Sequence, residues 1–441
     1  MRFHTTHKVE RVIVNGFLLV IMVGALLLWI SNNFLHKMPL SPVDALFLST
    51  SAVCVTGLSS INFSSEMGLV SQIILLALVQ IGGLGFMTAM MFLSVTVGRR
   101  IGIKSRMFFL GGLGVDGLEG AIRLLKVVLK FTFFFEAIGA SILFIGFITR
   151  GLSIIRSLYY AVFHSVSAFC NAGFSPIPNG LQSYANNIIV PGTIMSLIIL
   201  GGIGFPVFAE IFLFFKSKRR LSHYAKLVII ITASLLLFGT LFLSLSEWRH
   251  AFKDMPIWSK LWNGLFASVT ARTAGFDTVS YAKFSNVGQI ITILLMVIGA
   301  SPSSTGGGIK TTTLAILAIS VWNELHGRSE SIFMHRKIPY AAERRALALL
   351  VVYVFTFIFV AVILTALEGL PFGAVVFETA SAIGTVGLSV GITPEFSSAG
   401  KILLVFLMFW GRVGILSFFT SLVTTEKASE VHYSDVNIPI G

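Results

Sequence analysis

Long apolar runs limit what this chain can fold into more than any other feature of its sequence. Residues 12–30, 69–97 and 347–367 contain no charged side chain. A helix of about 20 apolar residues crosses roughly 30 Å of hydrocarbon, whereas a membrane β-strand alternates over about 10 residues. Only 12% of the chain is charged, where about 25% is usual in soluble domains. We therefore expect an all-α, multi-pass membrane protein without a cleaved signal peptide.

The basic residues lie in clusters between the apolar runs. The formal charge of +13 would suggest a nucleic-acid partner in a soluble protein. Here most Lys and Arg residues fall in residues 2–11, 99–130, 216–226 and 328–345, with Lys427 in the tail. The positive-inside rule places such segments in the cytoplasm. This predicts cytoplasmic termini, an even number of crossings and no nucleic-acid partner.

A four-fold internal repeat organises the chain. Residues 47–59, 163–175, 265–277 and 377–389 are similar, and each contains a glycine followed by Leu or Phe. The glycines are Gly57, Gly173, Gly275 and Gly387, spaced by 116, 102 and 112 residues. A long apolar run with a Gly-rich patch follows each one. The predicted units are residues 1–98, 99–220 with a cytoplasmic linker, 221–325 with a broken inner helix, and 326–441 with a cytoplasmic tail.

Each unit reads as an outer span, a short segment, a Gly-containing loop and an inner span. The short segments have about 10 to 12 residues, half the length of a crossing, so they must enter the membrane and turn back. Irregular backbone at that depth is tolerated where protein buries it or it lines a cavity. We therefore expect eight transmembrane helices plus four re-entrant pore helices, arranged as four parallel pseudosubunits around one central pore. Inverted repeats do not fit this polarity.

The loops have the composition of a neutral cation filter. Glycine adopts positive φ cheaply, so it can turn carbonyl groups toward an axis, where four per level replace the water of an alkali cation. No carboxylate occupies the three positions that end at each glycine, which favours a monovalent ion over Ca²⁺ or Mg²⁺. The predicted ion-binding residues are Val55, Thr56, Gly57, Asn171, Ala172, Gly173, Thr273, Ala274, Gly275, Thr385, Val386 and Gly387.

These loops resemble those of a known family. Val-Thr-Gly57-Leu, Asn-Ala-Gly173-Phe, Thr-Ala-Gly275-Phe and Thr-Val-Gly387-Leu are similar to the filter loops of the Trk/Ktr/HKT superfamily of potassium transporters, with the Ktr-type membrane subunit nearest. The resemblance implies gated potassium uptake across a bacterial cell membrane, with sodium dependence left open. It also implies potassium at the filter, a lipid-embedded homodimer, and a cytoplasmic nucleotide-binding ring from a separate chain. No organic cofactor is expected in this chain.

The third inner span has a break that the other three are expected to lack. Three successive glycines and Pro302 should interrupt a helix below the third loop. A simple cytoplasmic turn is the competing interpretation, but residues 314–321 are apolar again. The resemblance implies an intramembrane gating loop here. The predicted gate residues are Gly299, Ser301, Thr305, Gly306, Gly307, Gly308, Lys310 and Arg412.

Several ionisable residues fall within apolar stretches. Arg412 costs at least about 2.5–3.5 kcal/mol there unless it faces water or a partner. The resemblance makes it a positive barrier near the gating loop. Arg272 is interpreted as a strut behind the third loop, paired with Asp277, and Cys54 and Cys170 as packing residues. Weaker candidates are Glu136 as a hydrogen-bonded structural residue, Glu210 near an inner helix end and Glu378 as a support of a pore segment.

Two other functional classes compete with a pore. A sodium- or proton-coupled alternating-access symporter would be expected to carry coupling carboxylates or histidines and, usually, inverted repeats. An enzyme would need a nucleophile, base or metal motif, and the sequence contains no His-Glu-x-x-His, Gly-x-Ser-x-Gly or cysteine-pair pattern. The chain is therefore not expected to be an enzyme, and the symporter remains the alternative to the pore.

Overall fold

The structure is a helical bundle. The computed structural model describes residues 3–85, 118–218, 220–328 and 330–414. The first predicted unit contains α1 (Phe3–Ile30), the π-helical turn η1 (Ser31–Leu35), α2 (Pro42–Val53), α3 (Phe63–Glu66) and α4 (Leu69–Leu84). The second contains α7 (Leu118–Ile148), α8 (Ile154–Phe169), η2 (Gln182–Tyr184), α9 (Ile189–Gly202) and α10 (Phe205–Ser217).

The second half of the chain repeats this order of elements. The third unit contains α11 (His223–Glu247), α12 (Ile257–Thr270), η3 (Tyr281–Lys283), α13 (Asn286–Val297) and α14 (Thr311–Leu325). An unpredicted antiparallel hairpin of β1 (Ile332–Phe333) and β2 (Arg336–Lys337) follows. The fourth unit contains α15 (Tyr340–Glu368), α16 (Phe372–Gly384), η4 (Thr393–Glu395) and α17 (Ser398–Val413).

The first long helix of each unit has the length and composition of a membrane span. These stretches are Val14–Leu35, Lys126–Ile148, His223–Glu247 and Tyr340–Glu368. Their outer faces expose large apolar side chains, for example Leu19, Phe133, Leu237 and Phe355, as lipid-facing surfaces do. Among the described residues, four helices meet the criteria for a span, or five if the bent pair α9 and α10 counts as one. The eight crossings therefore stay a prediction.

The short second helix of each unit ends at the glycine-containing loop. Helices α2, α8, α12 and α16 have 12, 16, 14 and 13 residues, slightly longer than the predicted segments. Ser41 caps the first of them, accepting a hydrogen bond from the Asp44 amide at 3.0 Å. Each helix directs its carbonyl end, with its partial negative charge, at the loop that follows.

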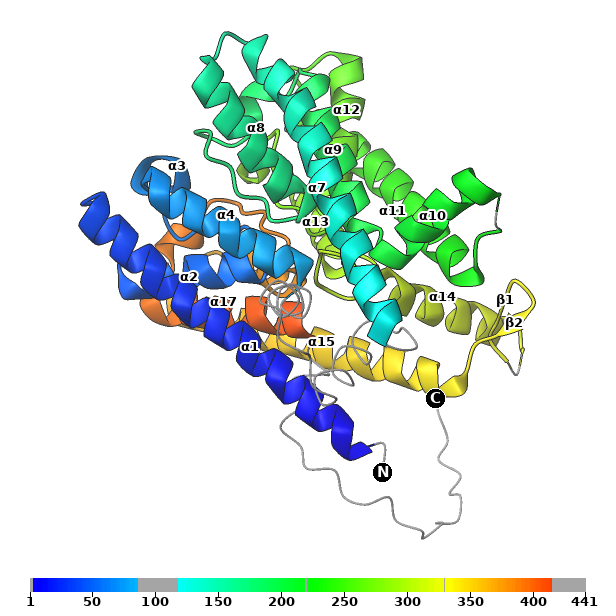
Figure 1. Cartoon of the computed structure of the whole chain (residues 1–441). Coiled ribbons are helices and arrows are strands. Elements are labelled where there is room, and N and C mark those ends of the chain that lie inside the picture. Colours follow the sequence, from blue (N-terminus) through cyan, green and yellow to red (C-terminus); the bar gives the residue numbers. More distant parts are fainter. Residues whose placement is uncertain (1–2, 86–117, 219, 329, 415–441) are drawn as a thin grey trace.

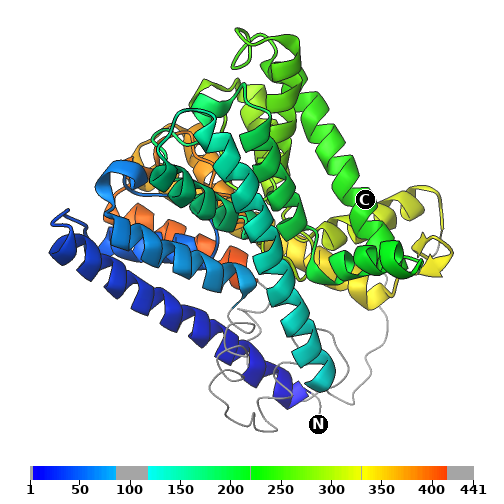
Figure 2. The same cartoon turned by 45° about the horizontal axis from the view of Figure 1, so that its top comes forward.

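Packing between the units follows a closed cyclic order. Helix α4 contacts α8 of the second unit, α9 contacts α12 of the third, and α13 contacts α16 of the fourth. Helix α17 of the fourth unit contacts α2 of the first. Figures 1 and 2 show the result, with α17 and α2 beside each other although they lie at opposite ends of the sequence. The four loops are therefore brought together near the middle of the bundle.

The expectation that the second inner helix continues without a break is wrong. Helix α9 ends at Gly202, and Gly204, with φ of 94°, is the N-cap of α10. Helices α4 and α17 have Gly85 and Gly414 as C-caps, with φ of 80° and 93°. Positive φ ends a right-handed helix and is cheap only for glycine. After Gly204 the chain resumes as α10 at an angle of 104° to α9. The residues after Gly85 and Gly414 lie outside the described part of the chain.

Candidate ion path

The four loops share an unusual backbone conformation. Gly57, Gly173, Gly275 and Gly387 have φ of 95°, 70°, 78° and 92°. The residue two positions earlier is also left-handed in every loop, with φ of 56° at Val55, 61° at Asn171, 68° at Thr273 and 50° at Thr385. Such angles are uncommon for a β-branched residue. Two left-handed residues separated by one other residue allow neighbouring carbonyl groups to face the same side.

Hydrogen bonds to the ends of the short helices hold the loops in this conformation. Ser51 accepts from the Thr56 amide through its carbonyl oxygen at 2.7 Å and from the Gly57 amide through Oγ at 3.0 Å. Ser381 does the same for Val386 and Gly387, at 2.8 and 3.0 Å. These bonds use the amide groups of the loops, so the carbonyl oxygens remain available.

The four loop glycines are close neighbours, and we call the four loops together the loop ring. A Cβ atom added to Gly57, Gly173, Gly275 or Gly387 would lie 3.2, 2.8, 3.1 or 2.9 Å from the Cα of the next glycine in the cycle. After Gly387 the next glycine is Gly57, so the cycle is closed. Each added Cβ would also meet a carbonyl oxygen of the next loop. No side chain larger than hydrogen fits at these positions without displacing the backbone.

Two threonine hydroxyls in the loop ring have no hydrogen-bond partner in the part of the chain that the structure describes. Thr56 and Thr385 are fully buried, and their Oγ1 atoms make no hydrogen bond within the described residues. A buried hydroxyl without a partner is costly, and water or an ion commonly satisfies it. The third threonine, Thr273, lies 3.4 Å from the Asn171 side chain. All three threonines are among the residues predicted to bind the ion.

A cavity of about 300 Å³ opens at the loop ring, and we call it the mouth cavity. The four loop glycines line it. The residues two positions further along, Ser59, Ser175, Asp277 and Ser389, line it as well. It therefore lies toward the C-terminal side of each loop.

The Gly-rich segment, residues 298–310 between α13 and α14, is folded into the bundle. It is held by backbone pairing within itself, where the Gly299 amide donates to Ile309 at 2.8 Å. It is also held by the end of α9: the amides of Ser301 and Thr305 donate to the carbonyls of Gly202 and Gly201 at 3.1 and 3.2 Å. Ser301 and Thr305 are fully buried. A simple cytoplasmic turn, the competing interpretation, would be exposed to solvent and would not make these contacts.

The Gly-rich segment touches the loop ring on the side away from the mouth cavity. A Cβ atom added to Gly306 would lie 3.1 Å from Cβ of Thr273, and one added to Gly307 would lie 3.0 Å from Cγ2 of Thr385. Both threonines precede the loop glycines by two residues. The segment thus lies against the third and fourth loops on that side.

Two cationic side chains bind carbonyl oxygens of this segment. Arg412 donates from one terminal nitrogen to Thr305 and from the other to Gly82 at the end of α4. Lys310 donates from Nζ to Gly306 at 2.7 Å and to Gly307 at 3.4 Å. The predicted gate residues are therefore brought together. The carbonyl groups of Gly82, Gly201 and Gly202, which accept hydrogen bonds from these gate residues, were not predicted from the sequence, although all three glycines lie in the Gly-rich patches that follow the loops.

The predicted pair of Arg272 with Asp277 is wrong. Within the described residues Arg272 makes no ion pair, and Asp277 Oδ2 instead accepts from Gln182 at 2.7 Å. Arg272 lies behind the third loop, beside Gly202 and Ala300 at a small cavity. The two side chains leave the loop in different directions because Arg272 follows the end of α12 and Asp277 lies beyond Gly275, at the mouth cavity.

The weaker candidates have structural partners. Glu378 is fully buried and accepts from Ser389, Val390 and Thr393 at 2.5, 3.0 and 2.8 Å, so it supports the fourth loop. Glu210 accepts from the Ser222 amide and hydroxyl at the start of α11. The main-chain oxygen of Glu136 accepts from Ser165, whereas its carboxylate Oε1 is buried and has no hydrogen-bond partner among the described residues, so the predicted structural role stays a prediction. Cys54 and Cys170 are buried free thiols.

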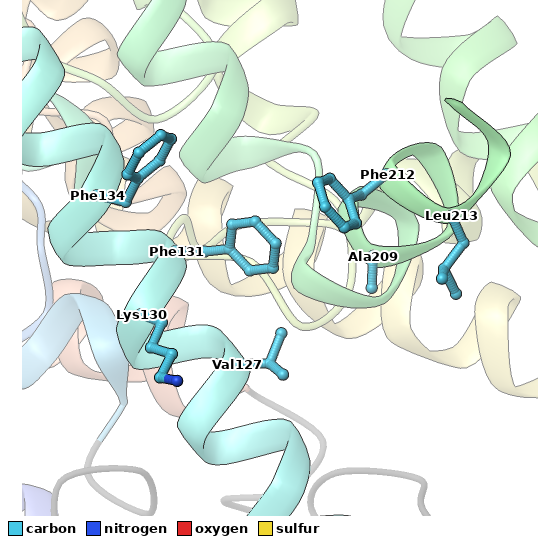
Figure 3. A pocket seen from close by; sticks show the side chains of 7 residues that line it. All are labelled: Val127, Lys130, Phe131, Phe134, Ala209, Phe212 and Leu213. Atoms are coloured by element: carbon cyan, nitrogen blue, oxygen red, sulfur yellow. The ribbon is translucent and has the colours of Figure 1, made fainter. Parts of the chain in front are cut away.

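A larger apolar groove lies away from the loop ring. It has a volume of about 760 Å³ and separates α7 from α10, where Phe131 and Phe212 face each other at 5.6 Å between ring centroids (Figure 3). None of its lining residues belongs to a loop or to the Gly-rich segment. Nowhere in the described ranges do three or more His, Cys, Asp or Glu residues gather to hold a metal ion. The loop ring is therefore the candidate site.

Comparison with known proteins agrees with this geometry. The model of the TrkH family, described as "Cation transport protein", matches residues 2–433. The chain belongs to this family. The predicted resemblance to the Trk/Ktr/HKT superfamily is thereby confirmed, and the chain is a transport protein and not an enzyme.

Members of the TrkH family resemble this chain along nearly its whole length. "Ktr system potassium uptake protein B" of Bacillus subtilis (strain 168) is 38% identical over 98% of this chain and 96% of its own. "Potassium/sodium uptake protein NtpJ" of Enterococcus hirae is 34% identical over 96% and 94%. The crystal structure of the potassium transporter TrkH from Vibrio parahaemolyticus matches with a TM-score of 0.75 at 19% identity, covering 95% of this chain and 85% of that one. The last likeness shows a common fold.

Proposed function

We propose that this chain takes up potassium through a gated pore whose selectivity filter is the loop ring. The observation that carries the proposal is the closed cycle of Gly57, Gly173, Gly275 and Gly387, each against the backbone of the next loop. Four loops with carbonyl groups directed to one axis can replace the hydration shell of a monovalent cation. The filter residues are the twelve predicted from the sequence, from Val55 to Gly387.

Potassium is the proposed cargo for two reasons. The residues that end at each loop glycine carry no carboxylate, so neutral oxygens bind the ion, which suits a large monovalent cation better than Ca²⁺ or Mg²⁺. The B. subtilis relative is named as a potassium uptake protein. The E. hirae relative is named for potassium and sodium, so sodium is the competitor that a transport assay must include.

The Gly-rich segment and Arg412 form the proposed gate. The segment lies against the ring at Thr273 and Thr385, and the Arg412 guanidinium donates a hydrogen bond to its Thr305 carbonyl. A fixed positive charge below the filter repels an approaching cation by about 2–3 kcal/mol at roughly 6–8 Å, for an effective dielectric constant near 20. Conduction therefore requires the segment to leave the axis and the guanidinium to be screened or moved.

The proposed architecture is eight membrane crossings in four parallel pseudosubunits, with both termini in the cytoplasm of a bacterial cell. The cyclic contacts from α4 to α8 through α17 to α2 support it. We further propose a homodimer with one pore per subunit and control by a cytoplasmic nucleotide-binding ring from a separate chain. The name "Ktr system" of three relatives is compatible with more than one component.

Flux through the purified protein in liposomes tests the proposal. Potassium uptake is measured with an inward-directed proton gradient, with an inward-directed sodium gradient, and with neither. A pore predicts uptake down the potassium gradient under all three conditions. Uptake that requires one of the two coupling gradients would instead identify an alternating-access symporter, and no cation flux under any condition would reject transport by this chain alone.

A further inference from the structure

The mouth cavity has a ring of side-chain oxygens of its own. Ser59, Ser175, Asp277 and Ser389 occupy the same position in the four repeats, two residues after the loop glycine, and all four line the cavity. Because the four glycines are neighbours in cyclic order, these side chains follow the same order around the mouth. We propose that they form an outer cation-binding site, in series with the filter, with Asp277 as its charged ligand. This inference rests on the proposed function.

The hydroxyl protons of two serines point away from the cavity. Ser59 Oγ donates to the Ile61 carbonyl at 2.7 Å. Ser389 Oγ donates to Oε1 of the buried Glu378 at 2.5 Å. A hydroxyl has one proton and two lone pairs. With the proton committed to a protein acceptor, the oxygen can offer only lone pairs to the cavity, as a cation ligand must. In Ser389 one lone pair already accepts from the Gly391 amide at 2.8 Å, which leaves the other for a cation.

The third serine is oriented in the same way by a histidine. His164 occupies in the second repeat the position that Glu378 has in the fourth, and it is fully buried. Its Nδ1 lies 2.7 Å from the Tyr160 carbonyl, which can only accept, so Nδ1 carries the proton. In a neutral imidazole Nε2 is then an acceptor, and it receives the Ser175 hydroxyl at 2.9 Å. His164 and Glu378 are chemically different, but each accepts the hydroxyl proton of the serine at the mouth cavity in its own repeat.

Asp277 supplies charge. It accepts from Gln182 through one carboxylate oxygen, and its backbone carbonyl accepts from the Leu181 amide at 3.1 Å, which fixes the residue at the cavity wall. Of the described residues that line the mouth cavity, only Asp277 is acidic and none is basic. A negative charge at a mouth raises the local cation concentration. Selection among cations remains with the neutral carbonyl groups of the filter.

Replacement of Asp277 by Asn tests the site. Asn has nearly the same shape and can still accept from Gln182 through its amide oxygen, while the charge is lost and the other carboxylate oxygen is replaced by an NH2 group. We expect the potassium concentration for half-maximal uptake to rise by about three- to tenfold at low ionic strength, with an unchanged maximal rate and an unchanged preference for potassium over sodium. The matched control is Asp254→Asn, an exposed acid between α11 and α12 that does not line the cavity, and it should leave uptake unchanged.

Two further measurements keep the proposal falsifiable if D277N folds poorly. Ser59→Ala removes a neutral ligand and should raise the half-saturating concentration by about twofold. In the wild type, an inert salt should weaken apparent potassium affinity, because ions screen exposed charges. Unchanged half-saturation in folded D277N and S59A, or a lower maximal rate alone, would overturn the outer site while the wild type still transports. Absence of potassium uptake by the wild type would instead overturn the proposed function.

Discussion

Arg412 on α17 donates a hydrogen bond to the main-chain oxygen of Thr305, which lies 107 residues earlier in the chain. Its second terminal nitrogen donates to Gly82 on α4. One guanidinium therefore joins the first, third and fourth repeats immediately below the loop ring. The planar fork of arginine can serve two divergent carbonyl groups at once, whereas the single ammonium of lysine cannot hold the same geometry.

Arg412→Ala should raise potassium flux. The substitution removes both the positive barrier and the anchor of the Gly-rich segment, while the filter residues stay in place. We expect a severalfold increase in flux through liposomes and an unchanged potassium to sodium permeability ratio. Arg412→Lys keeps the charge and should lie between alanine and wild type. Equal or lower flux in a correctly inserted alanine variant would make Arg412 a structural residue only.

Deletion of residues 304–308 should also raise flux. The deletion removes Thr305 and three glycines that lie against Thr273, Thr385 and Gly384, and so clears the axis. It should also weaken the dependence of flux on any regulatory partner. The thermal melting temperature of the purified variant checks that it is folded. Wild-type flux in a folded deletion variant would show that the Gly-rich segment is no gate.

Gly57→Ser should reduce the preference for potassium over sodium. The glycine has φ of 95°, and an added Cβ would lie 3.2 Å from Gly173 Cα, so the first and second loops must separate. The permeability ratio from reversal potentials measures the effect, and we expect a fall of at least about tenfold, equal to about 1.4 kcal/mol. Gly373→Ser is the control, because an added Cβ there meets nothing within 4 Å.

Lys401→Met should destabilise the contact between the first and last repeats. Lys401 Nζ lies 2.8 Å from Asp44 Oδ1, with side chains 14% and 15% exposed. Loss of such a mostly buried ion pair should lower the free energy of unfolding by about 1–3 kcal/mol, between the values for exposed and buried pairs. A lower melting temperature in detergent is the expected result, with exposed Lys283→Met as control. A double-mutant cycle with Asp44→Asn should show coupling, and strict additivity would contradict it.

Potassium affinity should depend on external pH through Asp277. Burial raises the pKa of this carboxyl to about 6, although the hydrogen bond from Gln182 opposes the rise. The charged form therefore dominates above pH 6 and is lost below it. The neighbouring phenol of Tyr281 has a pKa raised well above its usual value by burial, so it stays neutral throughout. Half-saturating potassium should rise as pH falls from 7 to 5, and D277N should show no such change.

The sequence predicted the helical class and the four loops because these features are local and repeated. Four glycines in register, each 24 to 28 residues before a Gly-rich patch, identify the family without any knowledge of contacts. The Gly-rich patches also mark close contacts between the inner helices and the short helices, which were not predicted from the sequence. Gly82, Gly201 and Gly411 lie against the carbonyl ends of α2, α8 and α16, where any side chain would collide.

The incorrect expectations concern backbone dihedral angles and side-chain partners that are defined only in the folded protein. Gly85, Gly204 and Gly414 occur in apolar surroundings, where glycine is common in membrane helices, so their positive φ was not evident. Asp277 was assigned to Arg272 because they are close in sequence, but Gln182 of the preceding repeat is the partner. Such partners come from neighbouring repeats, and their sequence separation of about 100 residues carries no local signal.

The closure of the cycle between α17 and α2 has a consequence for synthesis of the protein. Helix α2 is made near the start of translation and its partner α17 near the end. During most of synthesis the first loop therefore lacks one of its two neighbours, and its polar backbone must be shielded by water, lipid headgroups or insertion machinery. The loop ring can close only when α17, the last described helix, packs against α2. A chain released before α17 is made would leave the face of α2 that packs against α17 uncovered, and such exposed apolar surface promotes aggregation.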